Sequence, residues 1–213
     1  MSAFQADGAG PIPASRTVGK MKHYKVLVIT FAAVAVGVVA AVVFDVDLEG
    51  AQSLDLPPQF ANTYRSATGH GHKVVKLTSE VQELVSKING LDLEGKSGEA
   101  LLAIGEAEKI NEAAKGEALS LALELQKLVK ILDKHATFMQ RNALLSAVDV
   151  EIALVQEFVR YTGSISSFLA ALREAITSGT YENRAAVYDK LEEVNEYVTR
   201  INRLNGEFVK RIE

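Results

Sequence analysis

Histidines are the residues of this sequence best suited to metal or proton chemistry. Two of them, His70 and His72, are separated by one glycine in the run 69–72, Gly-His-Gly-His. In an extended or turn conformation both imidazoles could reach one metal ion, but two ligands form a weak site unless carboxylates from another helix or chain complete it. The alternative is a polar break in a helix whose histidines face solvent. In either case the imidazoles begin to charge at about pH 6.5.

Other patterns of catalytic or metal-binding residues are missing from the sequence. It has no cysteine, which excludes zinc–thiolate modules, disulfide scaffolds and cysteine nucleophiles. It also lacks the Gly-x-Ser-x-Gly, Walker and His-Glu-x-x-His motifs. A di-iron bundle requires histidines that follow a glutamate by three residues. None of the four histidines of this sequence meets that condition; they are His23, His70, His72 and His135. We therefore expect no catalytic residues, no cofactor and no enzymatic activity.

The longest apolar run predicts a membrane contact. Residues 26–44 contain no charge, Pro, Asn or Gln. As a helix they would extend roughly 28 Å, close to the thickness of the bilayer's hydrocarbon core. A buried helix of a soluble protein is the alternative. Ala33, Gly37 and Ala41 would share one face of this helix, where small side chains either allow two copies to pack closely or simply face lipid.

Charge on either side of this run predicts its orientation. Residues 1–25 carry four basic residues and one acid, a sum of +3. Because the whole chain sums to −4, residues 45–213 carry −7. Positive flanks stay in the cytoplasm, so we expect a cytoplasmic N-terminus and a C-terminal domain in the periplasm or outside the cell. The negative domain also argues against nucleic-acid binding.

Two segments flank the apolar run. Residues 1–25 are predicted to form a disordered basic tail, and residues 45–58 an acidic linker that ends in Pro57-Pro58. A cleaved signal peptide is the alternative to an uncleaved signal anchor. The apolar stretch is longer than a signal peptide usually contains, and the preceding tail is long as well, which favours the anchor.

The rest of the chain, residues 59–213, is predicted to be entirely helical. It contains no proline and is rich in Ala, Leu, Glu and Lys. Apolar residues recur at intervals of three and four, which predicts amphipathic helices. Turn signals at 89–98 and 178–180, and a capping box from Thr137 to Gln140, divide it into segments at 59–89, 98–135, 138–177 and 181–213. Ser146 with Asp149 offers an alternative boundary between the second and third segments. Similar lengths favour an antiparallel up-and-down bundle of about four long helices.

Several local details of this bundle are open to test. The glycines of the run 69–72 predict a kink, or a first helix that starts only at Lys73. Ser97 and Thr180 are expected to cap the second and last helices. The third segment carries two apolar stripes and should lie most centrally. Asn205, on the apolar stripe of the last helix, either fixes register or lies in a frayed end.

Two functions agree with these observations. The first is a membrane-anchored, non-catalytic helical scaffold that binds another protein or a second copy of itself. The second is a sensory bundle that binds a small ligand between its helices. The short N-terminal tail is too small to form an output domain, which favours the scaffold.

Overall fold

The computed structural model describes residues 57–135 and 138–212, which form four α-helices and no strand. This confirms the all-helical bundle. The helices are α3 (Pro58–Leu93), α4 (Ser97–His135), α5 (Phe138–Ser178) and α6 (Tyr181–Ile212). The predicted tail, the membrane segment with Ala33, Gly37 and Ala41, and most of the linker lie outside the described residues. No helix within the described ranges is both long and apolar enough to cross a membrane.

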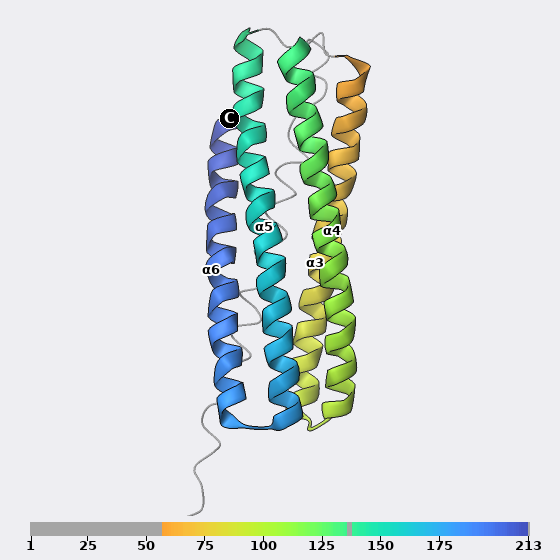
Figure 1. The fold of residues 1–213 in the computed structure, drawn as a ribbon, viewed down its shortest axis with the longest axis vertical. Helices are drawn as coiled ribbons and strands as arrows, with labels where there is room; N and C mark the ends of the chain where they lie inside the picture. The colour runs from red at the N-terminus through yellow and green to blue at the C-terminus, as the bar shows by residue number, and fades with distance from the viewer. Residues whose placement is uncertain (1–56, 136–137, 213) are drawn as a thin grey trace, which may run out of the picture.

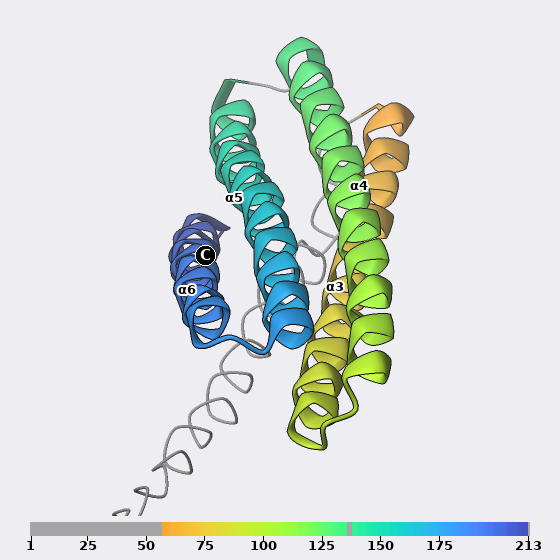
Figure 2. The same ribbon diagram turned by 60° about the horizontal axis from the view of Figure 1, so that its bottom comes forward.

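Consecutive helices run antiparallel and pack as two hairpins (Figure 1). α3 packs along α4, α4 along α5, and α5 along α6, so α3 and α6 take the outer positions (Figure 2). The turns at 94–96 and 179–180 lie together at what we call the two-turn end. The start of α3, the end of α4 and the end of α6 lie toward the opposite end, here called the open end.

The core is built from the apolar stripes that the sequence predicts. Each helix buries side chains at intervals of three and four residues, and the first half of α4 supplies mostly alanine. Small side chains on α4 let its neighbours approach closely. The glycines of α4 do not contribute to this packing, since a Cβ added at Gly116 would meet nothing and one at Gly105 only the end of Arg173. The buried α4 residues include Ala100, Ala103, Ile104, Ala107, Ala114, Ala118, Leu121, Leu125, Leu128 and Leu132.

Glycines with positive φ end two of the helices. Gly95 (φ 73°) follows α3 and Gly179 (φ 66°) follows α5, in a left-handed conformation that other residues adopt only with strain. The prediction that Thr180 caps α6 is confirmed, because its hydroxyl accepts a hydrogen bond from the backbone nitrogen of Asn183 at 3.4 Å. Ser97, by contrast, is the first residue of α4 rather than its cap: the Lys96 carbonyl accepts the first helical bond.

The prediction that the first helix starts only at Lys73 is wrong. α3 runs without interruption from Pro58 to Leu93, through the glycines of the 69–72 run and through Gly90. A helical glycine costs about 1 kcal/mol relative to alanine. Ala67 and Val74, on either side of the run, are buried, and so is Gly71. The packing of this face against the core therefore outweighs the low helix propensity of the glycines.

Buried polar contacts connect α5 to its neighbours. Asn111 of α4 donates hydrogen bonds to the Thr162 carbonyl at 2.8 Å and to the Ser166 hydroxyl at 2.9 Å. Gln82 of α3 forms a hydrogen bond with the hydroxyl of buried Tyr161. With the core side chains of α6 on its other side, α5 thus reaches all three other helices, in agreement with the central position predicted for it.

Candidate functional site

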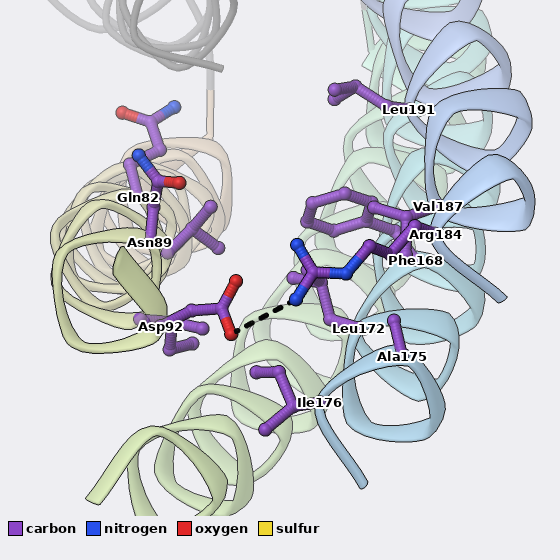
Figure 3. Close-up of a pocket in the computed structure, with 12 residues that line it drawn as sticks. Gln82, Asn89, Asp92, Phe168, Leu172, Ala175, Ile176, Arg184, Val187 and Leu191 are labelled. Carbon is purple, nitrogen blue, oxygen red and sulfur yellow. Dashed lines mark ion pairs between the residues drawn. The ribbon is translucent and has the colours of Figure 1, made fainter. Parts of the chain in front are cut away.

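An apolar cleft lies near the two-turn end of the bundle (Figure 3). It lies where α3, α5 and α6 face one another, since α3 and α6 do not pack closely along their lengths. Its volume is about 40 Å³, enough for a few water molecules and far below the roughly 300–1,000 Å³ of a drug-sized ligand site. Its apolar walls come from Val85, Ile88, Phe168, Leu172, Ala175, Ile176, Val187 and Leu191.

One ion pair crosses this cleft. The Arg184 guanidinium of α6 lies 3.9 Å from the Asp92 carboxylate of α3 (Figure 3). Gln82 and Asn89 add two amide groups on the α3 side. The pair is long and partly exposed, so it contributes little to stability. The pair places one positive and one negative group at the border of the apolar cleft.

Two exposed apolar residues adjoin cleft-lining residues in the sequence. Leu93 follows Asp92 at the end of α3 and is 42% exposed, and Tyr188, one turn beyond Arg184 on α6, is 39% exposed. Single exposed apolar residues are common on protein surfaces. Here the two residues adjoin, in the sequence, Asp92 and Val187, which line a hollow with apolar walls; such hollows are typical of protein-binding surfaces.

The two candidate metal ligands are not brought together. His70 and His72 are two residues apart on a continuous helix, so they point in different directions around α3. Within the described ranges, no group of three or more His, Asp or Glu residues is arranged to hold a metal ion. His70 instead contacts α4, where its Nδ1 lies 2.6 Å from the Glu117 carboxylate. His135 ends α4, and His23 lies outside the described residues.

The Glu117 carboxylate accepts hydrogen bonds from two side chains that carry, or can carry, a positive charge. Besides His70, Lys73 donates to it at 3.2 Å, so one carboxylate of α4 connects two side chains of α3. The hydrogen bond from His70, followed by that from Lys73, lowers the pKa of Glu117. In the sequence, Glu117 belongs to a run of alternating acidic and basic residues that is typical of a solvent-facing helix surface. In the structure it forms a contact between two helices.

The ionisable group that sequence reasoning missed is a buried carboxyl on α5. Glu151 is 6% exposed, and burial raises its pKa to about 8, so the carboxyl is mostly protonated at neutral pH. Glu151 lies close enough to Tyr64 of α3 to raise the pKa of that phenol, which burial raises more strongly. One signal was available: Glu151 adjoins Val150 and Ile152 in the segment predicted to bury two stripes, although Asp149, two residues earlier, is exposed.

Asn205 is the last of the predicted positions that lies among the described residues. α6 continues to Ile212, so Asn205 does not lie in a frayed end; its Oδ1 is buried without a hydrogen-bond partner.

Comparison of the chain with protein-family models, with curated proteins and with solved structures finds no match.

Proposed function

We propose that this chain is a single-pass membrane protein whose helical bundle is a non-catalytic protein-interaction module outside the cytoplasm. The observation that carries the interaction role is the apolar cleft, together with exposed Leu93 and Tyr188, which adjoin its lining residues in the sequence. The anchor and its orientation are supported by the apolar run 26–44 and by the opposite charges of its flanks.

The shape and chemistry of the cleft favour an amphipathic helix as its occupant. Its walls are aliphatic and aromatic, and its border carries Asp92 and Arg184. A helix that presents apolar side chains at intervals of three and four residues can place one of them in such a groove while its flanking charges pair with both signs at the border. The helix belongs either to another protein or to a second copy of this chain.

The position of the cleft also suits a partner that arrives from outside the membrane. α3 extends for 36 residues from Pro58 to Leu93, which corresponds to about 54 Å of helix. The predicted anchor precedes the first residue of α3, whereas the cleft lies near the last turns of that helix. A bundle that stands upright on the anchor would hold the cleft far from the lipid.

Site-specific photocrosslinking tests the interaction role. A benzophenone amino acid in place of Tyr188, which follows the cleft residue Val187, is compared with one in place of Lys134, an exposed residue near the end of α4. We expect a crosslinked species of defined mass from position 188 and none from position 134. Arg184→Glu, which places a second negative charge beside Asp92, should reduce its yield. Equal crosslinking at both positions, or none at either, would refute a partner at this cleft.

Orientation requires a separate measurement. Protease is added to intact cells whose outer barriers have been opened and which carry a C-terminal tag on the chain. Loss of the tag is expected if the bundle lies outside the cytoplasm. A protected tag would overturn the proposed topology without affecting the crosslinking result.

One observation favours the second function, a bundle that binds a small ligand. The cleft itself is too small for this role, but buried Glu151 of α5 and half-buried Tyr64 of α3, which lie away from the cleft, are polar and interact electrostatically.

A further inference from the structure

Exposed leucines gather on the outer face of α4. Within the described ranges five large apolar residues are exposed, and three of them belong to this helix: Leu102 at 77%, Leu119 at 49% and Leu123 at 59%. Leu119 and Leu123 are one turn apart and therefore lie side by side on the helix surface. Neighbouring exposed leucines are typical of a helix face that packs against another protein.

A hollow opens beside Leu123. Its volume is about 300 Å³, and Leu123, Lys127 and Lys130 of α4 line it together with His70 of α3. A leucine side chain from another molecule could enter it. The apolar cleft described above is lined by residues of α3, α5 and α6 alone, so this face of α4 is a separate surface.

Two charged residues continue the line of the leucines. Glu112 lies seven residues before Leu119, and Lys130 lies seven residues after Leu123; both are exposed. Seven residues are nearly two full turns, so all four side chains share one narrow face of α4. We call these four residues the α4 strip. Its acid lies toward one end and its base toward the other, at equal distances from the two leucines.

This spacing fits a second copy of the chain that runs in the opposite direction. In an antiparallel pair centred between the leucines, Glu112 of each copy meets Lys130 of the other. Leu119 of each copy likewise meets Leu123 of the other, beside the hollow. In a parallel pair, by contrast, Glu112 would face Glu112 and Lys130 would face Lys130, and opposed like charges disfavour association.

Contacts within one molecule leave these charges accessible. Glu112 contacts Lys115 at 3.4 Å, yet its side chain remains 69% exposed, so its carboxylate can pair with a second cation. Lys127, which also borders the strip, lies 2.7 Å from Glu124 of its own helix. The Lys127 charge is therefore largely neutralised before a second copy arrives.

We propose that the α4 strip is a homodimer interface through which two copies pack α4 against α4 in antiparallel orientation. The interface is isologous, since the same four residues contribute from both copies. The pairing ends at Lys130, and Lys134, one turn farther along, lies outside it. A contact between single helices is small, so we expect a dissociation constant on the order of micromolar.

The antiparallel orientation also places the two starting points of α3 at opposite ends of the dimer. Within each copy α4 runs from the two-turn end to the open end, where α3 begins (Figure 1). Two copies anchored as proposed above would therefore join two facing membranes. This arrangement rests on the proposed function, whereas the interface itself does not.

Sedimentation equilibrium of the full chain in a density-matched non-ionic detergent tests the interface. We expect a reversible monomer–dimer equilibrium that Leu123→Glu abolishes. Leu102→Glu is the matched control, because it makes the same change at an exposed leucine of the same helix, ten residues before Glu112 and outside the strip. It should leave the dissociation constant unchanged. Both leucines are exposed, so neither variant should impair folding.

Exchange of the charges tests the orientation. Glu112→Lys alone and Lys130→Glu alone should each weaken association about tenfold, because each replaces two attractive contacts by two repulsive ones. The double variant should restore it. Single variants that have no effect, or a double variant that does not recover, would overturn the antiparallel pairing.

A strictly monomeric chain would overturn the proposal, and so would a dimer that Leu123→Glu leaves intact. Arg184→Glu, which alters the cleft, should not change the dissociation constant, so the two proposed surfaces can fail independently. Vesicles that carry the full chain with its bundle outward should cluster, and those with Leu123→Glu should not. Dimers in detergent without vesicle clustering would overturn the facing-membrane arrangement.

Discussion

The amide nitrogen of Asn111 on α4 lies 2.8 Å from the carbonyl oxygen of Thr162 on α5 and donates a hydrogen bond to it. Asn111 is 3% exposed and takes a position on the alanine-rich stripe of α4. A shift of either helix along the other would separate these two atoms and leave the buried amide without a partner. The contact therefore favours one register between the two hairpins.

Asn111→Ala is expected to lower the free energy of unfolding by about 1–3 kcal/mol, because it removes one buried and one part-buried hydrogen bond and leaves a small void. Urea denaturation of the full chain measures the change. Gln126→Ala, at an exposed position of the same helix, should have almost no effect. Equal midpoints for the two variants would show that the buried amide does not stabilise the bundle.

Stability should fall as pH rises from about 4.5 to about 8, because of Glu151. Its folded-state pKa, about 8, lies above the ordinary value of 4.5. Within that window the folded protein binds more protons than the unfolded chain, so the stabilisation is complete below the window and is lost as pH rises through it. The expected loss is about 3 kcal/mol by neutral pH.

Glu151→Gln should remove this pH dependence and should be the more stable protein at pH 8. Glu174→Gln is the matched control from the same helix and should keep the slope of the unaltered chain. Thermal unfolding at several pH values gives the comparison. A slope that survives in Glu151→Gln would assign the effect to another group.

The same substitution should have opposite effects at two glycines. Gly179 has φ 66°, so Gly179→Ala strains the turn between α5 and α6 and should destabilise the protein by about 1 kcal/mol. Gly116 lies on an exposed face of α4 with open space around it, so Gly116→Ala should stabilise by up to about 1 kcal/mol. Denaturant midpoints that move in the same direction would contradict the backbone argument.

His70→Ala should raise the pKa of Glu117 toward its ordinary value, because the hydrogen bond from His70 is the largest cause of its lowering. A lowered carboxyl pKa contributes stability that is present above the unfolded pKa and is lost as pH falls through the folded one. The contribution should be below about 1 kcal/mol, since both side chains are partly exposed. NMR titration of Glu117 measures the shift.

His72→Ala is the natural control for that experiment, since its side chain lies on a different part of α3. It should leave the Glu117 titration in place. If both variants changed the Glu117 pKa equally, the direct contact with His70 would not be its cause.

The sequence alone determined the helical class, the four segments and their turns. Apolar residues at intervals of three and four, the Gly179 turn with Thr180 beyond it, and the absence of proline after Pro58 are local signals, and a helix responds to them locally. The same local rules failed at the glycines of the 69–72 run, because packing of Ala67, Gly71 and Val74 against the core outweighed their low helix propensity.

Only the tertiary structure decided which polar residues meet. His70 pairs with Glu117, 47 positions away, and Asn111 with Thr162, 51 positions away. Burial of Glu151 likewise depends on how α3 and α5 face each other, and the cleft exists because α3 and α6 stay apart near the two-turn end. Periodicity fixes which side of a helix is apolar. The neighbour of each polar side chain depends on register and on the angle between helices, and these follow from the packing of the whole core.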